Sequence, residues 1–413
     1  MNCPIALFDK SFLQSLSVDE SVWFDNFFLT NVCPLFYVET LADLEKSPRE
    51  GQTPEQQVGI IATKFPEMHG TPSVHHGYAI LAELMGDSVP MTGQIPPPGG
   101  RAIRAGDQTG VVFSRAPVVE AFTRWQQGEF LEVERLFARS WRDGLQALDL
   151  GTIADGFRAL GVNGASCRTL EEVKAVAQAV VTQLADMKRA CRILGIPGKL
   201  HESVIKRWRT AGSPPFVSYA PYAAHVLTVE VFFHLAVAAN LISRERRSNR
   251  VDIAYLYYLP FCMVFVSSDR LHQKCAPLFL RTNQLFVWGQ ELKADLQHLN
   301  AYYGQLPDAT KELGIMRFAG DPPDEGEFLV TRICNRFRVV GKGDRTVNPE
   351  ETLARYAALF GALGRQAHTT DEHVEEAEST LKKPDMIAVQ HSVKRRKGSW
   401  WQVPKALDSS GNA

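Results

Sequence analysis

The sequence lacks the cysteine patterns that mark disulfide-rich and zinc-binding proteins. Its seven cysteines include no CxxC pair and are odd in number, which argues against a disulfide framework and a standard zinc ribbon. We therefore expect reduced, mostly buried thiols. A large charge excess is also missing, because 45 basic and 46 acidic residues give a formal net charge of −1. Binding to a polyanion would have to depend on local basic patches.

Long apolar runs and targeting signals are absent as well. Residues 220–242 lack Lys and Arg but contain two histidines and Glu230, and residues 253–266 are short and include Pro260. A membrane span needs roughly 20 predominantly apolar residues. At the N-terminus, Asp9 interrupts the first apolar segment, and no basic segment precedes it, unlike a signal peptide. These features predict a soluble cytoplasmic protein without a membrane-spanning segment.

Several familiar catalytic motifs do not occur in the chain. It has no GxxxxGK[ST] phosphate loop, no GxSxG elbow and no Cys–His nucleophile signature. What the 413 residues do have is the composition of a soluble globular protein, with 45% hydrophobic and 22% charged residues. That length is enough for two or three domains.

Short apolar segments alternate with helix-like segments in two separate parts of the chain. In the first part, residues 4–8 and 33–38 read as buried strands, and residues 12–29 and 39–45 as helices. The alternation stops after Lys46 and resumes near residue 220. The later part predicts helices at 223–242, from Val251, at 270–279 and at 291–303, with strands at 262–266 and 284–288. Such alternation is typical of an α/β fold with a parallel sheet.

This pattern predicts a discontinuous domain organisation. Residues 1–46 and 216–305 would form one three-layer α/β/α domain, interrupted by a mainly helical insertion at 47–215. Residues 306–370 would form an α/β extension, with a strand pair at 327–340 and a helix at 350–363. We expect residues 371–413 to be a flexible tail, since they are polar, charged and C-terminal.

Acidic residues recur where the predicted strands end or the following helices begin. Asp9 ends the first strand, Glu39 follows the second, Asp252 opens a late helix and Asp269 ends the strand after it. Ligand sites in open α/β sheets form at the carboxyl ends of the strands. Four carboxylates gathered there would repel one another unless a cation is bound. An all-oxygen site of this kind suits Mg²⁺ or Mn²⁺.

Each acid taken alone has an ordinary structural explanation. An Asp after a strand is usually a turn or cap residue, Asp252 suits the first turn of a helix, and Glu39 suits a solvated helix surface. The four in this order and context favour a shared site.

The segments ALFDKSFL, PLFYVETLADL, VDIAYLYYLPFCMVFVSSD and QLFVW resemble those of PIN-domain nucleases. The resemblance covers about 1–46 and 216–305. It implies a PIN-like fold in which Asp9, Glu39, Asp252 and Asp269 are the catalytic metal ligands. It also implies that Ser11 and Ser268 support the ligands or contact the phosphate. Lys10, which departs from the family pattern, and Asp43 are further candidates for such roles.

The activity that this resemblance implies is hydrolysis of phosphodiester bonds in nucleic acid, more often RNA, by a metal-activated water. The chain would then be a PIN-like nuclease of prokaryotic type. Four arginines just before Asp252 are candidate contacts to the nucleic acid, namely Arg244, Arg246, Arg247 and Arg250. A second basic stretch at 394–397 precedes Trp400 and Trp401, which could stack on bases.

Two other functions remain open. The chain could be a PIN-like scaffold or binding module without activity, which need not keep all four acids facing one cleft. It could also be another metal-dependent phosphohydrolase, which should carry DxD after the first strand, whereas this chain reads Asp9, Lys10, Ser11. In either case the helical insertion offers a surface for a protein partner.

Overall fold

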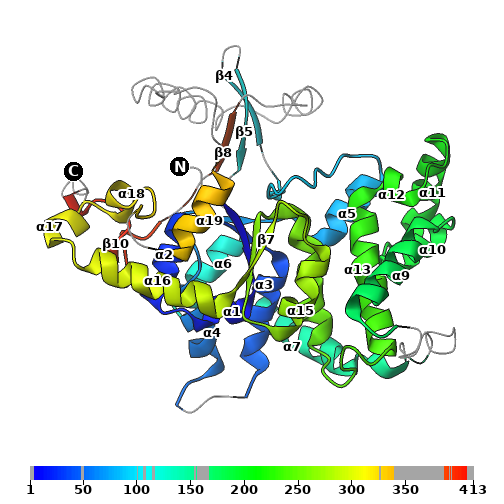
Figure 1. Ribbon diagram of the computed structural model, residues 1–413, viewed down its shortest axis with the longest axis horizontal. Helices are drawn as coiled ribbons and strands as arrows, with labels where there is room; N and C mark the ends of the chain where they lie inside the picture. The colour runs from blue at the N-terminus through cyan, green and yellow to red at the C-terminus, as the bar shows by residue number, and fades with distance from the viewer. Residues whose placement is uncertain are drawn as a thin grey trace.

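A computed structural model describes residues 4–47, 51–99, 101–105, 108–113, 117–152, 155, 167–324, 327–338, 386–389, 391 and 393–406 of the chain. Its centre is a sheet of five parallel strands, with helices on both sides (Figure 1). This confirms the predicted α/β class and the parallel sheet. The strands, in order across the sheet, are β3 (Gly70–Pro72), β2 (Leu29–Val32), β1 (Ile5–Phe8), β6 (Val264–Ser267) and β7 (Leu285–Trp288).

Strand β1 lies at the middle of the sheet and joins distant parts of the chain. Ala6 is paired with Thr30 of β2 on one side and with Val264 of β6 on the other. Every residue of β1 and β6 is buried, as expected for parallel strands that are covered on both faces. The first 46 residues and the segment after residue 216 therefore contribute to one sheet.

The helical region after β1 is divided in two. Residues 12–29, expected to be one helix, form α1 (Lys10–Ser15) and α2 (Val18–Phe27). Ser17 stops the first helix and caps the second, because its side chain accepts from the Glu20 amide while Glu20 accepts from the Ser17 amide.

The second strand lies earlier than predicted. Residues 33–38 are not a strand, because Pro34 begins α3 (Pro34–Leu41), which continues into the 3₁₀ helix η1 (Ala42–Glu45). Proline suits the first turn of a helix, where its missing N–H has no partner to lose. The true strand, β2, ends at Val32.

The segment 47–215 is not a purely helical insertion. Its strand β3 extends the central sheet by pairing with β2, so the sheet domain continues beyond residue 46. The described elements of this segment, in chain order, are α4 (Pro54–Thr63), β3, α5 (His76–Leu84), β4 (Arg101–Ala105), β5 (Gln108–Phe113), α6 (Pro117–Gln126), α7 (Glu132–Ala147), α9 (Leu170–Thr182), α10 (Met187–Ile193), η2 (Gly198–Leu200) and α11 (His201–Thr210). The short helix α12 (Phe216–Tyr219) follows it.

The predicted alternation after residue 220 is present, with small shifts in its boundaries. Its elements are α13 (Pro221–Ala238), α14 (Asn249–Ala254), the 3₁₀ helix η3 (Tyr255–Phe261), β6, α15 (Arg270–Phe279), β7 and α16 (Gly289–Gly304). By length and composition alone, α13 could cross a membrane, but 78% of it is buried inside the protein. It is a core helix of the described structure, and α5 and α9 pack against it.

The last part of the chain departs most from expectation. Residues 327–340 hold the helix α19 (Leu329–Phe337) in place of a strand pair, and the amides of Leu329 and Val330 donate to Asp295. Two short helices precede it, α17 (Asp308–Lys311) and α18 (Ile315–Phe318). The helix expected at 350–363 lies outside the described residues.

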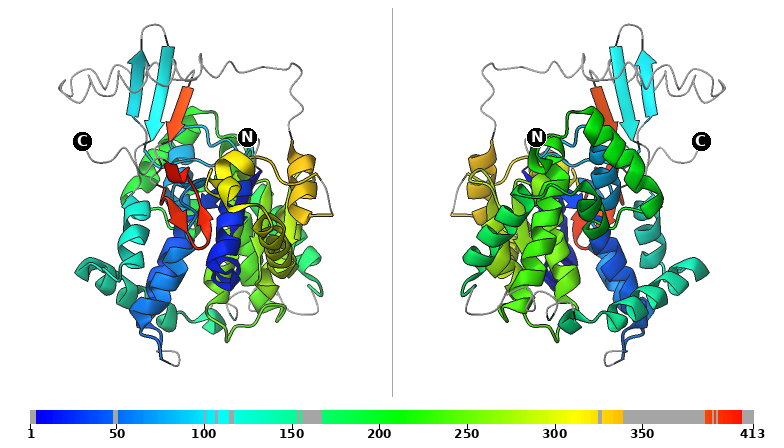
Figure 2. Two further views of the ribbon diagram at one scale, coloured as in Figure 1. Left: turned by 90° about the vertical axis from the view of Figure 1, so that its left-hand side faces the viewer. Right: turned by 90° about the vertical axis from the view of Figure 1, so that its right-hand side faces the viewer.

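Part of the expected flexible tail is ordered. Strand β8 (Met386–Val389) pairs with β5, and with β4 these strands form a second sheet that stands off from the main body (Figures 1 and 2). A hairpin of β9 (Arg396–Lys397) and β10 (Trp400–Trp401) then packs on the core. The ring of Trp400 is buried edge-on against Trp23, at 4.7 Å between centroids. Because Trp400 is buried, it is not available to stack on bases.

Candidate functional site

Asp9 follows β1 directly and occupies the cap position of α1. One carboxylate oxygen accepts the Phe12 amide at 2.9 Å, and the other accepts the Ser11 hydroxyl at 2.6 Å. The residue is only 3% exposed. Burial acts to raise the pKa of Asp9, but the neighbouring His272 and these two hydrogen bonds outweigh it, and the pKa is lowered. Asp9 is therefore a fixed, charged carboxylate at the carboxyl end of the central strand.

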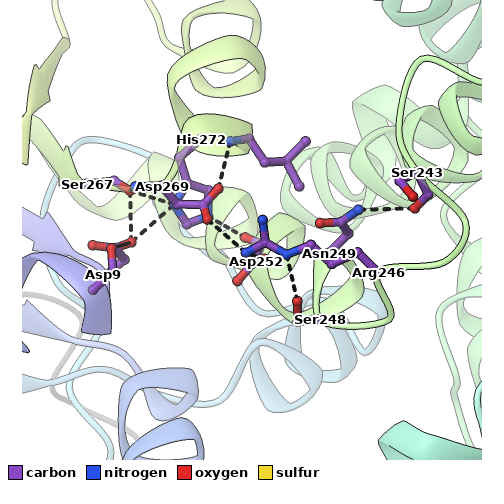
Figure 3. A network of polar contacts seen from close by, with 11 residues as sticks. Asp9, Ser243, Arg246, Ser248, Asn249, Asp252, Ser267, Asp269 and His272 are labelled. Atoms are coloured by element: carbon purple, nitrogen blue, oxygen red, sulfur yellow. Dashed lines mark hydrogen bonds and ion pairs between the residues drawn. The ribbon is translucent and has the colours of Figure 1, made fainter.

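Ser267, the last residue of β6, connects Asp9 to the next acid. Its hydroxyl donates to Asp9 Oδ2 at 2.8 Å and accepts the Asp269 amide at 3.0 Å (Figure 3). Asp269 in turn caps α15 by accepting the Leu271 amide at 2.6 Å. Since β1 and β6 are adjacent, the two aspartates at their ends lie close together.

His272 is a site residue that the sequence reasoning missed. Its ring is 1% exposed, with Nδ1 2.7 Å from Ser267 Oγ and 3.5 Å from Asp9 Oδ2, and Nε2 2.5 Å from the Asp252 carbonyl oxygen. Burial acts to lower the pKa of His272, but Asp9 and Asp252 outweigh it and raise the pKa to about 9. Both ring nitrogens therefore carry protons at neutral pH. The spacing of three residues from Asp269, within one helical turn, was the signal available in the sequence.

Asp252 lies in α14 and faces Asp269 across a guanidinium group. Nη2 of Arg246 is 3.2 Å from Asp269 Oδ2 and 3.5 Å from Asp252 Oδ2 (Figure 3). Burial, together with the charges of Glu39 and Asp269, raises the pKa of Asp252 to about 7. Asp252 Oδ2 is buried and accepts no hydrogen bond from the described residues. It is the least satisfied carboxylate oxygen of the group.

Glu39 completes the group, although it lies inside α3 and not at the start of a helix after a strand. Its Oε2 accepts the hydroxyl of Tyr255 at 2.5 Å. Burial and the charge of Asp9 raise the pKa of Glu39, against the effect of Lys10. The charges of Glu39, Asp9 and Asp252 thus act on one another across a short distance.

Two of the predicted supporting residues are paired with each other. Nζ of Lys10 is 2.7 Å from Asp43 Oδ1 and donates to the Glu39 carbonyl at 2.9 Å. Lys46 also contacts Asp43, at 2.7 Å. This buried ion pair fastens α1 to η1. Ser268, by contrast, has a buried hydroxyl without a hydrogen-bond partner among the described residues, directly beside Asp269.

The four arginines before Asp252 do not act as one basic patch. Arg244 and Arg247 are exposed, Arg246 bridges two acids, and Arg250 turns inward, donating to Glu230 at 2.5 Å and to Tyr257 at 2.7 Å. The turn that carries Arg246 is held by the Asn249 side chain, which donates to the Ser243 carbonyl (Figure 3).

The fit of this site to a metal ion depends on Arg246. Within the described residues, no group of three or more His, Cys, Asp or Glu side chains is arranged to hold a metal ion. The cations between the acids belong to the chain itself, with Arg246 at Asp252 and Asp269 and His272 at Asp9. The Arg246 side chain is 58% exposed, and its Nη2 lies between one oxygen atom of Asp252 and one of Asp269. Those donors suit Mg²⁺ or Mn²⁺.

Comparisons of the chain with protein-family models, with curated proteins and with solved structures give no match.

Proposed function

We propose that this protein is a metal-dependent nuclease that hydrolyses phosphodiester bonds in nucleic acid, RNA in preference to DNA, in the cytoplasm. One observation carries the proposal. Carboxylates from four separate segments, Asp9, Glu39, Asp252 and Asp269, act on one another at the carboxyl edge of the central sheet. Buried acids in such numbers are costly without a cation, and functional sites concentrate groups of this kind.

In this proposal Asp252 and Asp269 hold Mg²⁺ or Mn²⁺ once Arg246 has moved off. The chemistry that such an ion supplies is a lower pKa of bound water and compensation of charge on the phosphate. The chain's own residues orient the ligands. Ser267 and the Phe12 amide fix the direction of Asp9, and His272 holds Asp9 and the α14 backbone in register.

The arginines of the turn before α14 bind the nucleic acid in this proposal. Arg244 and Arg247 are exposed on the same turn as Arg246 and would contact phosphates on either side of the scissile bond. When Arg246 leaves the two acids, its guanidinium becomes available to a phosphate as well. A phosphate of the substrate would thus take the place of Asp252 and Asp269 as the ion-pair partner of Arg246.

A cleavage assay with single-stranded RNA and DNA in Mg²⁺ or Mn²⁺ tests the proposal, with EDTA as the metal-free control. Asp269→Asn should lower cleavage by more than about 100-fold, since even residues that only support metal ligands change activity by about 10- to 100-fold. Asp308→Asn is the matched control, because its side chain is 93% exposed and lies on α17. Cleavage of simple phosphate monoesters but of neither nucleic acid would favour the other phosphohydrolase.

A second function is an inactive PIN-like binding module, and one observation favours it. Arg246 and His272 already supply counter-charges to the acids, so the edge can be stable without a metal. Such a module would bind a protein partner through the segment 47–215, where α7 and α9 expose Val133, Leu136, Val176 and Val180. The absence of Mn²⁺ binding in calorimetry, together with inertness in the cleavage assay, would support this function over the nuclease.

A further inference from the structure

A cavity of about 390 Å³ lies against α3, α7 and α14, apart from the acids themselves. Pockets that bind small molecules commonly enclose roughly 300–1,000 Å³. One side is apolar, with the rings of Phe137 and Trp141 from α7. The other side is polar, with His76, Arg250 and Tyr257.

The cavity shares two structural elements with the acidic edge. Leu35 lines the cavity and lies four residues before Glu39, one turn away on the same face of α3. Val251 and Ala254 also line it, and they flank Asp252 in α14. The cavity and the acidic edge therefore share helices α3 and α14, so that a ligand in the cavity would lie beside the helices that carry Glu39 and Asp252.

The aromatic wall is suited to a flat ring. The rings of Phe137 and Trp141 are stacked on each other, with centroids 6.4 Å apart and an angle of 22° between their planes. Phe137 is 43% exposed, which is unusual for a large aromatic side chain that has a partner ring. Aromatic side chains that are held rigidly and open on one face are the platforms on which bases stack.

The polar wall is preorganised to donate hydrogen bonds. Arg250 is held by Glu230 and Tyr257, which also hydrogen-bond to each other, and its guanidinium lies 6.0 Å from the centroids of the Phe233 and Tyr257 rings. Two of its five N–H groups are used in these bonds, which leaves donors for a ligand in the cavity. The neighbouring His76 stays neutral, because burial and nearby positive charge lower its pKa to about 3.

We propose that this cavity is a base-binding subsite, which takes the nucleobase of a nucleotide next to the scissile phosphate. The base stacks on the Trp141 side and accepts hydrogen bonds from Arg250 at its edge. A flat π-system with acceptors on its rim matches both walls, whereas a purely apolar ligand would leave the Arg250 donors without partners. The assignment rests on the proposed nuclease function, but the cavity can be tested separately from it.

The first test measures binding of adenosine, guanosine, cytidine and uridine to the full-length protein by calorimetry, with indole as an aromatic probe that lacks acceptors. Gly144→Leu should lower nucleoside affinity by about 10-fold or more, because Gly144 lines the cavity and a Cβ atom there would meet no other atom within 4 Å. Its matched control is Gly304→Leu, at a helical glycine with equally open surroundings outside the cavity.

A second variant removes the stacking platform and leaves the cavity open. Trp141→Ala should weaken nucleoside binding by about 5- to 150-fold, the range that one stacked base supplies, and Trp141→Phe should restore most of it. Leu136→Ala controls for changes in α7, since Leu136 is 53% exposed and does not line the cavity. Indole binding as tightly as the nucleosides, or nucleoside binding unchanged in both cavity variants, would overturn the subsite.

The cleavage assay separates failure of the subsite from failure of the nuclease function. With an oligonucleotide that has one abasic position next to the cleaved bond, wild-type kcat/KM should fall by about 10-fold, and Trp141→Ala should show no further loss. Nucleoside binding without any cleavage would retain the subsite and reject the nuclease. Cleavage that ignores the abasic position, with no nucleoside binding, would retain the nuclease and reject the subsite.

Discussion

Two clusters of polar contacts in this protein each place aspartate near a basic side chain, and they differ in how they are closed. Asp25, in α2, accepts the amides of Glu67, Met68 and His69 at 2.7–2.8 Å, and the buried Lys397 supplies a positive charge nearby. At the carboxyl edge of the sheet, Asp269 and Asp252 share Arg246, whose side chain is 58% exposed.

The clusters differ in how deeply the basic side chain, Lys397 or Arg246, is buried. Lys397 is 4% exposed and its ammonium donates to the Phe65 carbonyl, so it belongs to the core along with the C-terminal hairpin. Arg246 reaches the acids from solvent, and Asp252 keeps a buried oxygen that no described group hydrogen-bonds. The first cluster fastens distant segments together, whereas in the second a solvent-exposed side chain supplies the positive charge.

The largest effect on stability should come from the cluster around Asp25. Asp25→Asn replaces a carboxylate that accepts three amides and leaves Lys397 buried with less compensation. We expect a loss of about 1–3 kcal/mol in the free energy of unfolding for each of these buried amides that is left without an acceptor. Urea denaturation followed by circular dichroism measures it.

The matched comparison is the same substitution at the open edge. Asp252→Asn removes one of several like charges, in a place where burial and the neighbouring acids disfavour the charged carboxylate. Its free energy of unfolding should be unchanged or rise by up to about 1 kcal/mol. If both variants lose stability equally, the distinction between the clusters is wrong.

A smaller loss of stability should follow from crowding next to Ser268. A Cβ atom at Gly289 would lie 2.2 Å from Ser268 Oγ and 3.1 Å from the Ser267 carbonyl carbon. Gly289→Ala should therefore destabilise the protein by about 1–3 kcal/mol. Gly304→Ala, in the same helix but in open space, should be neutral or mildly stabilising. Thermal melting measures both variants, and equal melting temperatures would contradict the prediction.

Two buried histidines differ in their surroundings, and one of them predicts how stability depends on pH. His272 lies among acids, whereas His225 donates to the Leu256 carbonyl at 2.9 Å, and burial lowers the pKa of His225 to about 4. The unfolded chain, with a histidine pKa near 6.5, then binds more protons than the native state between these two values. The contribution of His225 to stability is complete above about pH 6.5 and falls toward pH 4, where about 3 kcal/mol of it has been lost.

The measurement is urea denaturation at a series of pH values. His225→Gln keeps a donor for the Leu256 carbonyl but cannot titrate, so its stability should depend less on pH between 4 and 6.5. Equal slopes in the wild type and the variant would show that His225 does not carry this dependence.

The sequence predicted best the elements whose residues are uniformly apolar. Strands β1, β6 and β7 were placed within two residues because apolar runs bounded by polar residues mark buried strands. Strand β2 was misplaced because it buries the polar residues Thr30 and Asn31, and the Asn31 side-chain amide donates to the distant Phe261 carbonyl at 3.0 Å. A local pattern contains no information about such a partner.

The candidate site shows the same limit. The four acids were proposed from their positions beside strands and helices, but His272 was not noticed and Arg246 was expected to contact nucleic acid and not the acids. His272 and Arg246 reach the acids through the packing of α15 and of the turn before α14, which spacing alone does not reveal. The order in the C-terminal hairpin was likewise unpredictable, because Trp400 packs on Trp23, far away in the sequence.

The smallest effect on stability, and the most informative for function, should come from Arg246→Ala. An ion pair with a partner that is 58% exposed contributes little, so we expect a change within about 1 kcal/mol. If the edge is a metal site, removing the guanidinium exposes Asp252 and Asp269 together, and Mn²⁺ affinity measured by calorimetry should rise several-fold. Arg247→Ala, on the same turn and exposed, should leave that affinity as it is. If neither variant nor the wild type binds Mn²⁺, Arg246 is the permanent counter-ion of Asp252 and Asp269. The binding module would then be the better-supported function.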